Sequence, residues 1–227
     1  MFNLIAPFFQ DLYVRTGLNF IVFYDSYEYE RFLSGVSVSL QLIVWSSVVS
    51  LVIGVLGAWA QSARAPLLRG LMDAYIQAFR NTPPMVQLLF FYFALGTFTP
   101  QVDMGGYYQP LISSFMWAVI SLGIFGGAFN IEIFRAGLEA VPKSTKEAAE
   151  SLCMTKWQTY RYVTLPLAFR ISLPALTNNL VSLAKTTSLA YVIAVPEMTS
   201  TLNRVWSDNV NVPEMMLILF LFYVLVV

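Results

Sequence analysis

The stretch KSTKEAAESLCMTKWQTYRYVTLP, residues 143–166, is a polar island in a chain that is otherwise mostly apolar. Ser144 and Glu147 have the spacing of a capping box, in which a hydroxyl and a carboxylate satisfy free NH groups at a helix start. Thr155 and Gln158 repeat that spacing further along. The pattern predicts two short helices with a turn between them.

The first of these helices carries unusually small side chains. Ala148 and Ala149 have little bulk, so another protein surface can approach the backbone closely there, and Leu152 offers an apolar tip. An amphipathic loop lying on lipid headgroups is an equally good interpretation of the residues alone, and it would suit the basic side chains of the stretch. These are Lys143, Lys146, Lys156 and Arg161.

The composition of the whole chain indicates a membrane protein. Of 227 residues, 57% are hydrophobic and 11% are charged, whereas soluble domains are about 25% charged. Several apolar runs approach the roughly 20 residues that cross a bilayer as a helix, and barrel strands would instead be alternating segments of about 10 residues. The sequence therefore predicts an all-α membrane protein, a bundle of about five transmembrane helices.

Five apolar segments are the candidate spans. We expect Thr82 to cap the second and Pro83 to lie in its first turn, where a missing NH costs little. The last is shorter than a full crossing, so either the sequence is a fragment or other residues complete this helix. The predicted spans are 36–60, 82–98, 110–134, 166–195 and 213–227.

Basic residues orient the bundle, because short cytoplasmic loops hold an excess of lysine and arginine. Residues 61–80, which include Arg64, hold three, and residues 135–170 hold six. The other connections and the N-terminal segment hold only Arg15, Arg31 and Arg204. This asymmetry predicts an N-terminus outside the cell and a cytoplasmic loop at 136–165.

The sequence lacks the residues that several classes of protein function require. Net charge is zero, so no basic field favours nucleic acid. The chain has no histidine and a lone cysteine, Cys153, which removes the usual metal and general-base constellations. It also lacks the GxxxxGK[ST] loop that cradles ATP phosphates. We therefore expect a protein that is not an enzyme and binds no metal or cofactor itself.

The opening stretch resembles the hallmark of permease subunits of ATP-binding-cassette (ABC) importers. That hallmark is Glu-Ala-Ala, three residues, Gly, nine residues, then Ile-x-Leu-Pro. This chain has the Glu-Ala-Ala at 147–149, Cys153 in place of the usual Gly, and then Val163, Leu165 and Pro166. If the turn requires a positive φ, Cys153 is strained there, because glycine alone adopts that region freely.

The resemblance implies the type I ABC importer permease fold in a bacterial inner (plasma) membrane. It implies a coupling helix that docks on a separate ATPase subunit, which would hold ATP and Mg²⁺. A second permease subunit, identical or related, and a periplasmic or extracellular solute-binding protein are the other implied partners. The implied coupling residues are Ser144, Glu147, Ala148, Ala149, Leu152 and Cys153.

Three further segments resemble the subfamily that imports polar amino acids. They are RNTPPMVQLLFFYFALG (80–96), FNIEIFRAGLEAVP (129–142) and LAKTTSLAYVIAVPEM (183–198). Thr186 stands where the subfamily commonly has Asp or Asn. The resemblance covers a permease domain at 32–227, whereas residues 1–31 form a separate periplasmic or interfacial segment that matches no known pattern.

The fourth predicted span carries polar residues along one helical face. Pro174, Asn178, Ser182 and Lys185 are spaced by four, four and three residues. Polar groups in hydrocarbon normally face a protein interior or a water-filled path, so we expect this face to line the translocation pathway. Hydrogen bonds to neighbouring helices are an equal alternative. The face continues through Thr186, Thr187 and Ser188, and Gln87 is a weaker candidate of the same kind.

Two other functions remain open at this level. An ion-coupled secondary transporter would use membrane-embedded charges such as Lys185 and Glu132, and a scaffold bundle would transport nothing. Glu132 and Arg135 lie one helical turn apart, which favours a structural ion pair between them.

Overall fold

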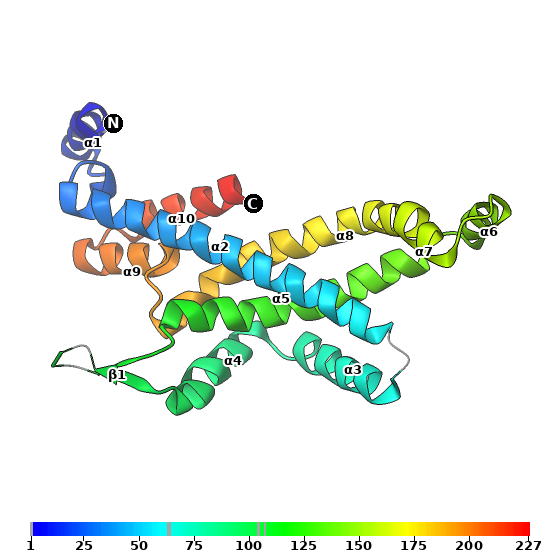
Figure 1. Cartoon of the computed structure of the whole chain (residues 1–227). Helices are drawn as coiled ribbons and strands as arrows, with labels where there is room; N and C mark the ends of the chain where they lie inside the picture. Colours follow the sequence, from blue (N-terminus) through cyan, green and yellow to red (C-terminus); the bar gives the residue numbers. More distant parts are fainter. Residues whose placement is uncertain (1, 63–64, 104, 107) are drawn as a thin grey trace. The chain divides into compact units, whose positions relative to one another are not determined.

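The computed structural model is mostly helical and describes residues 2–62, 65–103, 105–106 and 108–227 (Figure 1). Arg64, one of the basic residues counted above, lies outside the described residues. The chain divides into two compact units and passes between them four times, each time within a helix. Unit 1 comprises Met1–Val44, Leu88–Ala118 and Ala184–Val227; unit 2 comprises Trp45–Gln87 and Val119–Leu183.

Two long apolar helices contain the first predicted span and most of the third. The third span was predicted to begin at residue 110, but Pro110 ends a short strand and the helix begins at Ser114. Helix α2 is Ser26–Gln61 and helix α5 is Ser114–Glu139. Among the described residues, these two are long and apolar enough to cross a membrane. Helix α2 begins ten residues before the predicted span because Asp25 caps it: its carboxylate accepts a hydrogen bond from the Glu28 NH at 3.0 Å.

The second predicted span is a composite helix. It starts as α4 (Pro84–Leu89), continues as the π-helix η2 (Phe90–Leu95) and ends as the 3-10 turn η3 (Gly96–Phe98). The start was predicted wrongly, since the Thr82 hydroxyl donates backward to the Ala78 carbonyl at 2.8 Å. Helix α3 leaves carbonyls free at its C-terminus, and Thr82 satisfies one of them instead of capping α4.

The fourth and fifth predicted spans are also helical. Helix α8 (Leu165–Thr186) contains Pro174 and runs on as the 3-10 helix η5 (Thr187–Ile193). Helix α10 is Val212–Val226. Helix α8 has 22 residues, enough to cross, yet its polar face makes it less apolar than α2 and α5.

Some elements occupy segments that were expected to be loops or were left unassigned. They are helices α1 (Phe2–Thr16), α3 (Pro66–Arg80) and α9 (Met198–Asn209), and a hairpin of strands β1 (Gln101–Asp103) and β2 (Tyr108–Pro110). The strands are antiparallel, and Gln101 lies opposite Pro110. Pro66 opens α3 at a first-turn position, which was a usable start signal.

Unit 1 is built on a cluster that joins the N-terminal segment to α9 and α10. The 3-10 turn η1 (Ile21–Phe23) inserts Val22 into it. Asn211 donates to the Asn19 carbonyl at 2.8 Å, and Glu214 accepts from the Asn19 NH at 2.9 Å. These bonds hold the N-terminal segment on α10. The other buried members are Met198, Leu202, Val205, Met215 and Ile218.

In unit 2, glycines let the second half of α2 and the core of α5 approach closely. A Cβ added to Gly127 would lie 2.5 Å from the Ile53 side chain, and one on Gly54 would lie 2.5 Å from the Asn130 Cβ. Gly123 precedes Gly127 by four residues, so α5 carries the GxxxG spacing that brings membrane helices together.

A buried amide network joins three helices of unit 2. Asn130 of α5 donates to the Ser50 hydroxyl of α2 at 3.1 Å. Asn179 of α8 donates to the Asn130 carbonyl oxygen at 2.8 Å and to the Gly126 carbonyl at 3.2 Å. Asn179 therefore serves as an interhelical link.

The predicted ion pair between Glu132 and Arg135 does not form. Glu132 pairs with Arg80, the last residue of α3, and Arg135 has its carboxylate partner at Glu139, 3.8 Å away. The Arg80 guanidinium also lies over the Phe129 ring, 5.2 Å from its centre. Arg80 thus contacts both a carboxylate and an aromatic ring on α5. Arg135, one turn from Glu132, makes no such double contact in the described structure.

Candidate functional site

The polar stretch folds as a helical hairpin between α5 and α8 (Figure 1). Its first helix, α6, is Lys143–Ser151 and begins at Pro142. The predicted capping box of Ser144 and Glu147 is absent, since no side chain caps this helix. Proline presets the backbone for a helix start and the Pro142 carbonyl accepts the Thr145 NH at 3.2 Å, so Ser144 already lies within the first turn.

The second helix, α7 (Lys156–Thr159), begins as predicted. The Gln158 NH donates to the Thr155 hydroxyl at 3.3 Å, and the Thr155 NH donates to the Gln158 side-chain oxygen at 2.8 Å. This is a complete capping box. A π-helical turn, η4 (Tyr160–Thr164), connects α7 to α8. The predicted arrangement of helix, turn and helix is therefore confirmed.

The turn between the two helices places Cys153 in the left-handed region, with φ at 56°. The Cys153 NH donates to the Glu150 carbonyl at 2.9 Å, and the Met154 NH donates to the Ala149 carbonyl at 3.2 Å. These bonds close a left-handed helix end of the kind that usually carries glycine. The turn requires a positive φ, so Cys153 is strained.

The hairpin exposes part of α6 and the tip of the turn. Ser144, Glu147, Ala148 and Cys153 are exposed, and Leu152 at the tip is 78% exposed. Ala149 differs, because it is buried, with 4% of its surface exposed. Further along, the large apolar rings of Trp157 and Tyr162 are also exposed.

The predicted polar face of α8 is a real surface feature. Pro174, Asn178, Ser182 and Lys185 are all exposed, as their common helical face requires. Asn179, one position away, is turned inward into the amide network.

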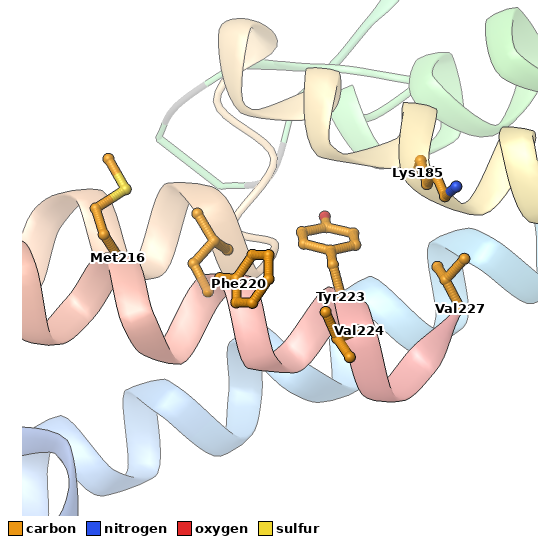
Figure 2. A pocket seen from close by; sticks show the side chains of 7 residues that line it. Lys185, Met216, Phe220, Tyr223, Val224 and Val227 are labelled. Carbon is orange, nitrogen blue, oxygen red and sulfur yellow. The ribbon is translucent and has the colours of Figure 1, made fainter.

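Lys185 borders a cavity of about 590 Å³ in unit 1 (Figure 2). Figure 2 shows the Tyr223 hydroxyl pointing from α10 toward the segment that carries Lys185. Among the described residues, no three His, Cys, Asp or Glu side chains gather as a possible metal site. The remaining lining residues are apolar and come from α10 and the residue after it: Met216, Leu219, Phe220, Val224 and Val227.

The three residues after Lys185 differ in exposure. Thr187 is buried, and its hydroxyl donates to the Ala184 carbonyl at 2.7 Å. Ser188 is half-buried and donates to the Lys185 carbonyl at 2.8 Å, and Thr186 is half-buried. The exposed polar face therefore ends at Lys185, and the three residues after it are buried or half-buried.

Gln87 belongs to unit 2. It is buried, and its amide NH₂ donates to the Phe79 carbonyl at 2.8 Å and to the Thr82 carbonyl at 3.0 Å. These bonds fasten the connection between α3 and α4. Sequence reasoning missed Asn130, although an amide in the middle of an apolar span was a usable signal.

Comparisons with known proteins place the chain in one family. Residues 50–227 match the model of the binding-protein-dependent transport system inner membrane component. The L-cystine transport system permease protein TcyB of Bacillus subtilis (strain 168) is 32% identical over 177 residues, 78% of this chain and 71% of that protein. The glutamine transport system permease protein GlnP of Escherichia coli (strain K12) is 32% identical over 190 residues, 82% of this chain and 83% of that protein.

Solved structures agree with this placement. A chain in the crystal structure of an amino acid ABC transporter with histidines superposes with a TM-score of 0.75 at 29% identity, covering 87% of both chains. A chain of the inward-facing MetNI methionine ABC transporter gives 0.66 at 19% identity, covering 88% of this chain and 93% of that one, which shows the fold. The fold is that of type I ABC importer permeases, and nothing found favours an ion-coupled transporter. The chain belongs to the family of inner membrane components of binding-protein-dependent transport systems.

Proposed function

We propose that this chain forms half of the pathway through which an ABC importer takes up polar amino acids. One observation carries the proposal: the Glu147 to Pro166 motif folds as an exposed helical hairpin between two long helices. Relatives such as TcyB and GlnP are permeases for L-cystine and glutamine. A separate ATPase subunit, holding ATP and Mg²⁺, supplies the energy.

The hairpin is the coupling element in this proposal. Leu152 and Cys153 at its tip, with Ala148, Ser144 and Glu147 on its exposed side, contact the ATPase. The apolar Leu152 side chain, exposed to solvent in the isolated chain, gains most from burial in a groove of the partner. Ala149 acts from inside, because a small buried side chain lets the two short helices close on each other.

The polar face of α8 is the proposed wall of the pathway. Asn178, Ser182 and Lys185 are exposed on it, with Thr186 and Ser188 beyond. The Lys185 ammonium beside the cavity suits the carboxylate that every amino acid carries. The buried Thr187 and Gln87 keep the neighbouring backbone in place.

The proposed assembly has two-fold architecture. A second permease, identical or related, supplies the other half of the pathway, and a solute-binding protein delivers cargo to the outer face. The chain crosses the inner membrane several times with its N-terminus outside, as the distribution of lysine and arginine indicates. The hairpin then lies in the cytoplasm, where the ATPase is.

A substitution at the hairpin tip should weaken binding of the ATPase subunit and leave the fold of the permease intact. We expect Leu152→Arg to lose most of the ATPase subunit on co-purification, because a charge replaces the apolar group that the groove buries. The matched control is Leu67→Arg on α3, since Leu67 is 76% exposed, close to the 78% of Leu152. If both variants retain the ATPase equally, the proposed coupling role of the hairpin is wrong.

The substrate class is tested in the reconstituted complex. We expect its ATP hydrolysis to rise when the solute-binding protein is loaded with a polar amino acid. Transport that proceeds without ATP and disappears in Lys185→Met would support the ion-coupled alternative and contradict the proposal.

A further inference from the structure

Helix α1 packs on unit 1 with one aromatic face. The ring of Phe9 lies 4.7 Å from that of Phe23 and 5.9 Å from that of Phe20. The ring of Tyr13 stacks on that of Tyr24 at 6.0 Å, and the ring of Phe2 lies 4.9 Å from that of Tyr29, on the first turn of α2. Helix α1 is therefore held firmly in place by its own unit.

The opposite face of α1 carries three large apolar side chains, and nothing in the described chain covers them. Leu4 is 84% exposed, Phe8 is 65% exposed and Val14 is 79% exposed. At 100° per residue these three positions fall within one third of the helix circumference. Between them lie Asp11 and Arg15, which form an ion pair at 2.8 Å. The charges of this face thus cancel.

Helix α1 thus has large apolar side chains on two opposite faces, and such side chains favour burial in protein or lipid. Helix α1 has 15 residues, so it is about 22 Å long, too short for the roughly 30 Å of a hydrocarbon core. It contains Pro7, which removes one hydrogen bond of the helix interior. Length and composition together favour a helix that lies in a membrane surface.

The position of α1 at the start of α2 agrees with a location at the membrane surface. Leu33, Leu40 and Val44 form an exposed apolar stripe on one face of α2. Tyr29, on which α1 packs, precedes Leu33 by four residues, about 6 Å along a helix. Figure 1 looks nearly along α1, whereas the first half of α2 runs across the view, so the two helices are not parallel. The helix thus meets α2 where its exposed apolar stripe begins.

We propose that α1 is an interfacial helix whose Leu4, Phe8 and Val14 face is inserted among lipids at the boundary of headgroups and acyl chains. It lies on the side of the membrane that holds the start of α2, the outer leaflet in the orientation proposed above. The Asp11 and Arg15 pair lies on the same face and therefore at the same boundary, and its net charge of zero gives no preference for anionic lipid.

The test uses the photoreactive residue benzoylphenylalanine in the complete transporter, reconstituted in phosphatidylethanolamine and phosphatidylglycerol vesicles. It replaces Phe8 in one variant and Val14 in a second, so the result does not rest on one substitution. Phe9 is the matched control, because it is the adjacent aromatic residue on the packed face. The same residue at Val44 serves as the reference for lipid contact, and at the exposed Tyr108 of strand β2 it serves as the reference for solvent.

We expect phospholipid adducts at Phe8 and Val14 at the level of Val44, and several-fold above those at Phe9 and Tyr108. The yield should not change when phosphatidylglycerol is omitted. Lipid adducts no more abundant than at Tyr108 would overturn the proposal. Adducts with the solute-binding protein or with a second permease in place of lipid would also overturn it, and would assign the face to that protein.

Discussion

Cys153 is the residue at which backbone strain and proposed function coincide. With φ at 56° it occupies a conformation that costs an L-residue roughly 1–2 kcal/mol. Glycine removes that cost but gains freedom in the unfolded chain. We therefore expect Cys153→Gly to raise the free energy of unfolding of the purified complex by about 0.5–1 kcal/mol.

The matched control keeps the strain and removes the thiol. Cys153→Ala should leave the thermal midpoint close to that of the original protein, because alanine has a Cβ and the same left-handed penalty. A Cys153→Ala variant that is stabilised as much as Cys153→Gly would mean that the thiol, and not the backbone, is responsible.

At the residue scale, sequence reasoning succeeded only in part, even where the predicted partners are local. The capping box of Thr155 and Gln158 involves residues three positions apart, and it forms. The equivalent box at Ser144 does not form, because Pro142 starts the helix earlier. Glu132 could be assigned a partner within one turn but not the distant Arg80, since that choice depends on how α3 packs against α5.

At the element scale, close packing of α2 against α5 depends on Gly127. A side chain there meets Ile53 of α2 and the Tyr75 hydroxyl of α3. We expect Gly127→Leu to lower the free energy of unfolding by about 1–3 kcal/mol, the usual cost of overpacking. Thermal unfolding of the purified complex, followed by circular dichroism, measures the change.

Gly70 provides the matched control for that substitution. It lies in α3, and a Cβ added there has no heavy atom within 4 Å among the described residues. Gly70→Leu should not destabilise, because leucine is the better helix former by somewhat under 1 kcal/mol. Equal destabilisation by the two substitutions would contradict the packing account.

The amide network predicts coupling between α5 and α8. Asn130→Ala and Asn179→Ala each break the same hydrogen bond, so the double variant should cost less than the sum of the two. Such bonds contribute on average about 0.6 kcal/mol in membranes, and unfolding in a bilayer mimic by steric trapping can measure this. Asn178→Ala is the control, since its exposed side chain should show no coupling to Asn130. Strict additivity of Asn130→Ala and Asn179→Ala would refute the network.

Length and periodicity were enough to predict the five long apolar elements. They missed α1, α3 and α9, because polar and charged residues interrupt the apolar runs of these helices. The π-helical turns η2 and η4 have no simple sequence signal, since tertiary packing imposes them. Interhelical contacts such as Asn179 with Asn130 were equally out of reach, because they depend on helix register.

At the scale of the whole molecule, the family was predictable and the details of its site were only partly so. Spacing from Glu147 to Pro166 identified the permease resemblance, and the family comparison confirms it. The exposed side of α8 followed from helical periodicity. The burial of Ala149, Thr187 and Gln87 could not be predicted in the same way, because burial is set by segments distant in the sequence.

The central claim is that the α6 and α7 hairpin lies in the cytoplasm and docks on an ATPase. Cys153 is the only cysteine of the chain and is exposed at the hairpin tip, so it reports on both points without any substitution. The measurement is its labelling by a membrane-impermeant maleimide in vesicles of either orientation, with and without the ATPase subunit. We predict labelling in inside-out vesicles stripped of the ATPase and protection once the ATPase rebinds. Labelling from the outside of intact spheroplasts, or labelling that the bound ATPase leaves unchanged, would contradict the account.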